Sequence, residues 1–222
     1  NAPAIAHALI AAHQAYRHNS EQLASIDDTL GRGSGMAENT PYEEVRDFFH
    51  FMDNYIHAID LKAEALANRL DIGDADSFPL LSHHLDRAHG VRVTRAGRDD
   101  DLIRSFDRKT RVLALHPYLP PATRDFQLAI EIARIEAAGE VDAIARNASF
   151  RTAEAYEICR IGLHNYFAGA LLLPYRKFME TARELRHDLE LLSVRFGASV
   201  EQVCHRLSTL QRPGQKGIPI FF

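Results

Sequence analysis

Residues 121–138 carry apolar side chains on almost every side of a helix. The few charged residues in the first half are Arg124 and Asp125, and the next is Glu131. A helix that lacks a polar stripe has to be buried on most sides. Pro121 suits the first helical position, and a strand-like run at 111–116 precedes it through a proline-rich turn. The pattern predicts a buried central helix.

Most of the remaining chain has helical periodicity. Residues 3–30 keep apolar side chains at helical spacing, which predicts one long helix that pairs with a partner helix or a second subunit. Thr40 to Glu43 form a capping box with proline at the first helical position, a strong start signal. Further helices are expected at 59–70, 77–89, 140–147, 152–173, 175–186, 188–196 and 199–211.

Between residues 91 and 115 the pattern changes to alternation, which is typical of strands. Three short strands are expected, at 91–93, 102–106 and 111–115. Residues 97–101 and 107–110 should form the turns between them. The fold class is therefore α+β: mostly helical, with a small three-stranded sheet packed by a helical bundle and a long N-terminal helix.

Length and composition limit the classes of protein to which this chain can belong. A chain of 222 residues can bury one good core, or one domain with a helical extension. It contains no run of about 18 apolar residues, so we expect no membrane span. Cys159 and Cys204 lie far apart in helical patterns, which favours a reduced, cytoplasmic protein. Because the chain starts at Asn1 and stops within an apolar run, we expect it to be a piece of a longer protein.

Charge is distributed unevenly along the chain. The net charge of −4 argues against binding of a nucleic-acid phosphate backbone by the whole chain. Residues 174–216 nevertheless hold 8 Lys and Arg against 5 Asp and Glu, a balance of +3. This end could hold a small anionic ligand or form a solvated helical face, and composition does not choose between them.

The 12 histidines do not have the spacing of a metal site. Two ligands on one turn of a helix stand four residues apart, and no HExxH occurs in the chain. The neighbours His83 and His84 point apart on a helix. The pairs His50/His57, His13/His18 and His84/His89 are seven, five and five residues apart. We therefore expect scattered histidines and no metal in this chain.

Two helical segments have further possible roles. Residues 195–200 resemble the turn of a helix-turn-helix, followed by polar residues that could read DNA, but any short corner between helices with a Ser cap gives the same pattern. In residues 152–173, Gly162 and Gly169 allow close approach of another helix or a ligand. His164 and Asn165 in the same helix are either satisfied core groups or pocket donors.

Three segments together carry the resemblance to one family. They are 42–55 (YEEVRDFF and NY), 162–175 (GLHNYFA and LPY) and 195–214 (RFG, EQVCHRL and TLQRPG). The chain resembles the bacterial short-chain fatty acyl-responsive transcriptional regulators of the RamB and PrpR type, which govern acetate, glyoxylate and propionate metabolism. The resemblance implies an Xre-type helix-turn-helix before this region, through which operator DNA is bound. A cysteine-containing region would follow this one, and any iron–sulfur or zinc site is expected in that later region.

The middle of the chain resembles the ImmA/IrrE metallopeptidase fold, whose central helix carries HExxH. By that resemblance Phe126, Gln127 and Ile130 stand where His, Glu and His would be, and Leu163 falls near the third ligand. Catalytic zinc needs about three protein ligands and an open position. The resemblance therefore implies a pseudo-metallopeptidase, not an enzyme, whose scaffold binds a ligand.

The expected ligand is coenzyme A or a short-chain acyl-CoA, held between helices 121–138 and 152–173. Such an effector needs an apolar slot and cationic donors for its phosphates. For each candidate, packing is an equal explanation, and ion pairs with Asp125 and Glu157 compete for two of the arginines. The candidates are the lining residues Phe126, Gln127, Leu163 and Tyr166; the cations Arg124, Arg160, Arg176 and Arg212; and the hydrogen-bonding residues Asn54, Tyr55, His164, Asn165 and Tyr175.

The resemblance also suggests a division of the chain. Residues 1–35 are expected to be a dimerisation or linker helix, 36–216 the ligand-sensing domain, and 217–222 the start of a further region. The expected assembly is a homo-oligomer, with no membrane partner. Two alternatives remain: a metal-dependent hydrolase of the ImmA/IrrE type that uses scattered histidines, and a purely structural dimerisation module.

Overall fold

The computed structural model describes residues 40–74, 76–97 and 102–219. The predicted helix at 3–30 lies outside the described residues, as do most of the turn at 97–101 and the last three residues of the segment 217–222. The dimerisation role of the N-terminal helix and the division of the chain into three parts therefore stay predictions.

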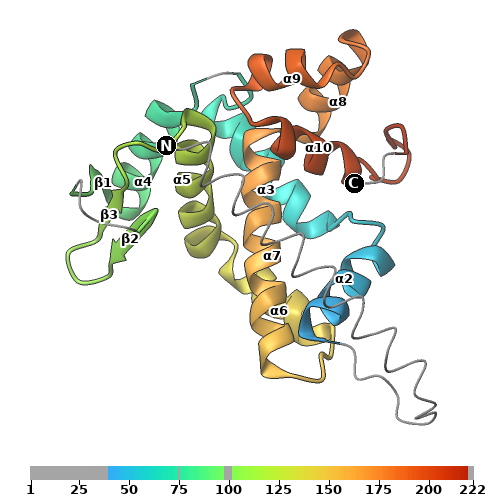
Figure 1. Cartoon of the computed structure of the whole chain (residues 1–222), viewed down its shortest axis with the longest axis horizontal. Helices are drawn as coiled ribbons and strands as arrows, with labels where there is room; N and C mark the ends of the chain where they lie inside the picture. Colours follow the sequence, from blue (N-terminus) through green and yellow to red (C-terminus); the bar gives the residue numbers. More distant parts are fainter. Residues whose placement is uncertain (1–39, 75, 98–101, 220–222) are drawn as a thin grey trace, which may run out of the picture. The chain divides into compact units, whose positions relative to one another are not determined.

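Helix α7 (Ala153–Leu172) runs through the middle of the helical part (Figure 1). Its Leu163 and Phe167 are completely buried. Thr152 caps its start, because the side-chain oxygen accepts a hydrogen bond from Ala155 N at 3.1 Å. The helices that pack along α7 are α2 (Pro41–Phe51), α3 (His57–Leu70), α5 (Pro121–Glu136) and α6 (Ala138–Asn147).

Helix α5 confirms the prediction of a buried central helix that begins at Pro121. Its Leu128, Ala129 and Ile132 are completely buried, and it lies between α7 and α4 (Phe78–His89). Helix α4 ends where the sequence indicates, since Gly90 adopts a left-handed conformation with φ of 61°. Helix α4 packs against both α5 and β1, so it links the central helix α5 to the sheet.

The sheet has three strands in the order β1-β3-β2. Strand β3 (Val112–Leu115) is central, parallel to β1 (Arg92–Arg95) and antiparallel to β2 (Arg104–Asp107). Leu113 and Leu115 on one face of β3 are buried, whereas β1 and β2 are mostly exposed. The predicted α+β class, with a three-stranded sheet, is confirmed.

Three helices close one end of α7 in Figure 1: α8 (Tyr175–Glu184), α9 (Leu189–Phe196) and α10 (Val200–Ser208). Gly197 ends α9 in a left-handed conformation with φ of 61°. Ser199 and Gln202 then form a capping box that starts α10: Ser199 Oγ accepts from Gln202 N at 3.1 Å, and Gln202 Oε1 accepts from Ser199 N at 2.9 Å.

None of the helices in the described part of the chain combines the length and the apolar character that crossing a bilayer requires.

Candidate functional site

A cavity of about 600 Å³ lies between α7, α10, the start of α5 and α2. This volume falls within the range of small-molecule sites. Its apolar surface comes from Phe49, Phe126 and Ala170, and from the backbone of two glycines. The polar part of the lining comprises Asn54, Thr123, Asn165, Tyr166, Ser199, Glu201, Gln202, His205, Arg206, Ser208 and Thr209.

The two glycines of α7 have opposite surroundings. A Cβ atom at Gly162 would stand 3.0 Å from Cε2 of Phe49, so a side chain there would require the Phe49 ring to move by a few tenths of an ångström. A Cβ atom at Gly169 would meet no atom within 4 Å. Both residues line the cavity. Gly162 therefore brings the Phe49 wall close, whereas Gly169 leaves open space.

The turn between α2 and α3 places Asn54 at the cavity. Asp53 and Asn54 both have positive φ, 52° and 54°. Asn and Asp are the residues that tolerate this conformation best, apart from glycine. Hydrogen bonds from Asp53 N to His50 O at 2.9 Å and from Asn54 N to Phe49 O at 2.8 Å hold the turn. The side chain of Asn54 is thus presented by a closely defined backbone.

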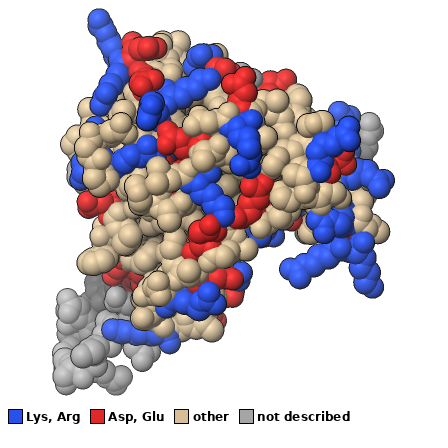
Figure 2. Space-filling view, turned by 180° about the vertical axis from the view of Figure 1, so that it is seen from behind, with Lys and Arg blue, Asp and Glu red and all other residues tan. Residues whose placement is uncertain are grey.

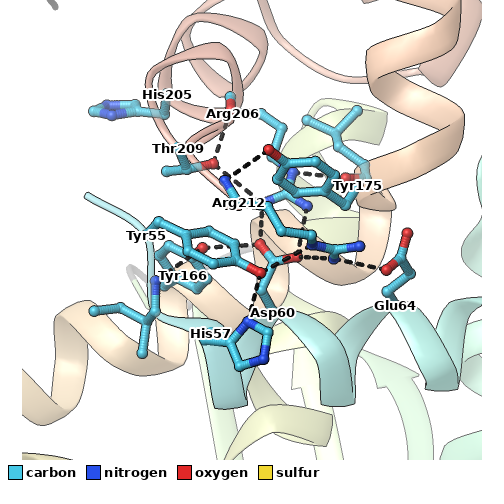
Figure 3. A network of polar contacts seen from close by, with 12 residues as sticks. Tyr55, His57, Asp60, Glu64, Tyr166, Tyr175, His205, Arg206, Thr209 and Arg212 are labelled. Atoms are coloured by element: carbon cyan, nitrogen blue, oxygen red, sulfur yellow. Dashed lines mark hydrogen bonds and ion pairs between the residues drawn. The ribbon is translucent and has the colours of Figure 1, made fainter. Parts of the chain in front are cut away.

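Behind the cavity lies a buried network of polar groups centred on Asp60 of α3 (Figure 3). Asp60 Oδ2 accepts hydrogen bonds from Arg206 Nη1 at 2.6 Å and from Tyr166 OH at 2.8 Å. Its Oδ1 accepts from Arg212 Nη2 at 3.0 Å. A buried carboxylate needs such partners, because desolvation of an unpaired charge is costly. Asp60 therefore fixes α3, α7, α10 and the segment after α10 to one another.

Both arginines have further partners. Arg206 donates through Nε to Leu173 O at 2.7 Å and through Nη1 to Thr209 Oγ1 at 3.1 Å. Arg212 donates through Nε to Tyr55 OH at 2.9 Å and through Nη2 to Glu64 Oε2 at 2.7 Å. Its guanidinium also lies over the Tyr175 ring, 4.0 Å from the centroid. Two carboxylates and two guanidiniums thus balance each other inside the network.

The network also sets the protonation of Tyr166. Burial raises the pKa of its phenol well above the usual value, and the neighbouring Asp60 carboxylate raises it further. The hydroxyl also accepts a hydrogen bond from Ile56 N at 3.2 Å. For Arg206, burial acts to lower the pKa but the Asp60 carboxylate outweighs it, so the guanidinium pKa is raised. Tyr166 is a neutral donor and Arg206 a charged one.

The sequence-derived candidates fall into three groups. Phe126, Asn54, Asn165 and Tyr166 line the cavity. Tyr55, Tyr175 and Arg212 belong to the network behind it, where Tyr175 OH donates to Gln215 O at 2.8 Å and accepts from Arg212 N at 2.9 Å. The remaining candidates are not among the lining residues: Arg124, Gln127, Arg160, Leu163, His164 and Arg176.

The two candidate arginines on the helices expected to hold the ligand, Arg124 and Arg160, are paired with acids. Arg124 donates through Nε to Asp125 Oδ1 at 3.0 Å and lies over the Phe78 ring. Arg160 donates to Asp142 Oδ1 at 2.8 Å and to Glu157 Oε2 at 2.9 Å. These contacts are the ion pairs that compete with a phosphate-binding role, with Asp142 as an additional partner.

The other candidates outside the lining have different surroundings. Leu163 is completely buried in the core, and Gln127 is half-buried on α5. His164 is buried, and among the described residues its Nε2 atom has no hydrogen-bond partner. The side chain of Arg176 is exposed, while its backbone N–H donates to Glu64 Oε1 at 2.8 Å.

Sequence reasoning missed the contribution of α10 as a cavity wall. Residues of α10 were considered only as a possible DNA-reading surface. The one available signal was Arg206, which stands beside Leu207 and three residues after Val203, on the apolar face of the helix. An arginine on a buried face requires an acid elsewhere in the chain. That acid is Asp60.

The positions that the resemblance assigns to the metal ligands of the metallopeptidase fold do not fit a metal in this chain. Phe126 lines the cavity, Ile130 packs against the core and Leu163 is buried within it. None of these three side chains offers a lone pair to zinc. We therefore derive no hydrolytic step at this position.

Comparison with known proteins places these observations in a family. Residues 86–208 match the model of the IrrE N-terminal-like domain. A propionyl-CoA carboxylase regulator of Cereibacter sphaeroides is 47% identical over 229 residues, which cover 100% of this chain and 47% of that protein. The HTH-type transcriptional regulator RamB of Mycobacterium tuberculosis is 38% identical over 223 residues, covering 99% of this chain and 47% of that protein.

A solved structure supports the same relationship. A Mycobacterium tuberculosis transcriptional regulator superimposes with a TM-score of 0.78 at 40% sequence identity, covering 81% of this chain and 55% of that chain. The chain spans about half the length of the curated relatives it matches.

Proposed function

The chain belongs to the IrrE N-terminal-like domain family, and we propose that it is the ligand-sensing region of a transcriptional regulator that responds to a short-chain acyl-CoA. The observation that carries the proposal is the cavity of about 600 Å³ beside the position where this fold would hold its metal. A peptidase scaffold with apolar residues at its metal-ligand positions, and a cavity of small-molecule size beside them, suits the binding of a ligand without hydrolysis.

The lining favours the acyl and pantetheine parts of the ligand. Phe49 and Phe126 offer apolar contact for a short acyl chain, and Asn54 and Asn165 offer amide groups that can pair with the pantetheine amides. Arg206 is the charged donor of the wall, but its guanidinium is already committed to Asp60. We therefore place the uncharged part of the ligand in the cavity and its phosphates towards solvent.

The network behind the cavity supplies a route by which binding could be sensed. Tyr166 and Arg206 line the cavity and both bind Asp60. A ligand that shifts either side chain changes the contacts among α3, α7 and α10. A ligand can shift the equilibrium between two arrangements of these helices only to the extent that it binds one arrangement more tightly than the other.

DNA binding is assigned to a part of the regulator outside this chain. Relatives of about twice the length are named as HTH-type regulators. On the face shown in Figure 2, Lys and Arg are interspersed with Asp and Glu over the helices, and gather mainly where the sheet projects. The mixed sign over the helices is a poor match for a phosphate backbone.

Calorimetric titration of the full chain with acetyl-CoA, propionyl-CoA and free coenzyme A tests the proposal. A Leu side chain at Gly169 would enter open space in the cavity. We therefore expect Gly169→Leu to lose binding while the helix content and melting temperature are kept.

Gly139→Leu is the matched control, since a Cβ atom at this exposed helical glycine also meets no atom within 4 Å. Binding that is equally strong in the Gly169→Leu protein and the unmodified chain would show that the cavity is not the ligand site. Absence of binding to all three compounds would refute acyl-CoA sensing by this chain.

A further inference from the structure

The ends of α4 and α5 bring two imidazoles and a carboxylate together. Nε2 of His84 lies 2.5 Å, and Nε2 of His89 lies 2.8 Å, from the same oxygen, Oε1 of Glu136. The side chains of these three residues are only 10%, 17% and 17% exposed. We propose that His84, His89 and Glu136 form a zinc-binding site.

The donor set is one that zinc uses. Two histidine nitrogens and one carboxylate oxygen, with an open fourth position, are a recognised zinc arrangement, with bonds of about 2.0–2.2 Å. The three ligand atoms already lie within 4.8 Å of one another. In a tetrahedral site with such bonds, ligand atoms stand about 3.3 Å apart. A small outward movement of the two rings from the carboxylate therefore makes room for the ion.

The site is built by the way both helices end. His89 is the last residue of α4 before the left-handed Gly90, and Glu136 is the last residue of α5. The two helices pack against each other. At the end of α4, two rings five residues apart turn towards each other, and their centroids are 5.2 Å apart at 89°. The spacing of five residues between His84 and His89 did not indicate a site in the sequence, and the third donor, Glu136, comes from another helix.

The neighbouring cations leave the shared oxygen to the histidines. Nη2 of Arg69 lies 3.6 Å from Oε2 of Glu136, the other carboxylate oxygen. The guanidinium of Arg111 donates to the backbone oxygen of His89. Neither contact occupies Oε1 or an Nε2 atom. The site is also distinct from the metal position of the peptidase fold at Phe126, Ile130 and Leu163.

A bound ion would join α4 to α5 next to the start of the sheet. With three protein ligands from two helices, it would cross-link elements that otherwise meet through side-chain packing and the contacts of the two histidines with Glu136. Binding to the folded state raises the stability of that state by mass action. The ion would therefore stabilise the folded state.

Titration of the tag-free, chelator-treated full chain with Zn²⁺ alone tests the site. We expect one ion per chain, a rise in melting temperature, and a visible spectrum typical of low coordination when Co²⁺ replaces Zn²⁺. His84→Ala and Glu136→Gln should each weaken zinc binding by more than about a hundred-fold, because loss of a direct ligand costs more than loss of a group that only orients a ligand. His83→Ala, at the exposed neighbour on the same helix, should leave it unchanged.

Circular dichroism shows whether each variant folds, and the cobalt spectrum of the unmodified chain gives a readout that needs no variant. Failure of the unmodified chain to bind one Zn²⁺, or zinc affinity that survives in folded His84→Ala and Glu136→Gln proteins, would overturn the site. Acyl-CoA affinity should be the same with and without the ion, so the two proposals fail independently.

Discussion

Arg206 of α10 and Asp60 of α3 form a buried ion pair across 146 residues of sequence, with Nη1 and Oδ2 2.6 Å apart. Their side chains are 3% and 0% exposed. Water therefore cannot replace a lost partner, and without Arg206 the two carboxylates Asp60 and Glu64 would have to share Arg212 alone.

Removing one member of this pair should destabilise the fold strongly. We expect Arg206→Met to lower the free energy of unfolding by about 3–5 kcal/mol, measured by urea denaturation. The exposed pair Arg46–Asp47 is the control, and Arg46→Ala should cost no more than about 1 kcal/mol. A loss of similar size in both variants would contradict the role of the network.

The raised pKa of Tyr166 predicts a loss of stability in alkali. In the unfolded chain the phenol loses its proton near pH 10, whereas in the folded chain it keeps the proton to higher pH. Ionisation therefore stabilises the unfolded state relative to the folded state above about pH 10. The free energy of unfolding falls by up to about 1.4 kcal/mol per pH unit for one such group.

Denaturant unfolding between pH 9 and 11 measures this slope. Tyr166→Phe should reduce the slope, while Tyr42→Phe, at a tyrosine that is 73% exposed, should not. Identical slopes in all three proteins would show that Tyr166 is not protected from ionisation.

Alanine at the two cavity glycines of α7 should have opposite effects. Gly169→Ala should raise stability by up to about 1 kcal/mol, because alanine favours the helix and the added Cβ meets open space. At Gly162 the added Cβ would press on Phe49, so Gly162→Ala should give no gain and should disturb the cavity wall. Thermal denaturation compares the two proteins, and an equal gain in both would mean that Phe49 moves aside at no cost.

The ion pairs of Arg124 and Arg160 lead to a different expectation from the sequence. As phosphate donors, each would contribute about 1.5–3 kcal/mol to ligand binding. Because both have carboxylate partners and neither lines the cavity, we expect Arg124→Ala and Arg160→Ala to leave acyl-CoA affinity unchanged. A loss of ten-fold or more in a folded variant would restore the phosphate role.

Local signals explain why the helices could be predicted. Pro121, Gly90 and Ser199 start or end helices through their own backbone preferences, so the boundaries agree within a few residues. The order of the strands could not be predicted in the same way. The parallel pairing of β1 with β3, on the far side of β3 from β2, depends on packing against α4 rather than on the turns.

The candidate site was only partly accessible from the sequence. Asn54, Asn165 and Tyr166 follow from the family resemblance, and all three line the cavity. The partners of Asp60 and of Glu136 lie on other elements far along the chain. Tertiary packing determines which residues pair across such separations, and the hydrophobic periodicity of the sequence does not indicate these pairs.

The charge balance of Asp60, Glu64, Arg206 and Arg212 has a consequence for how the site responds to salt. At 0.1 M, dissolved ions largely screen the interaction between exposed charges that are more than about 10 Å apart, but they screen buried pairs much less. The wall of the cavity should therefore keep its shape across a wide range of ionic strength. Any salt sensitivity of ligand binding would then report on the part of the ligand that remains in solvent.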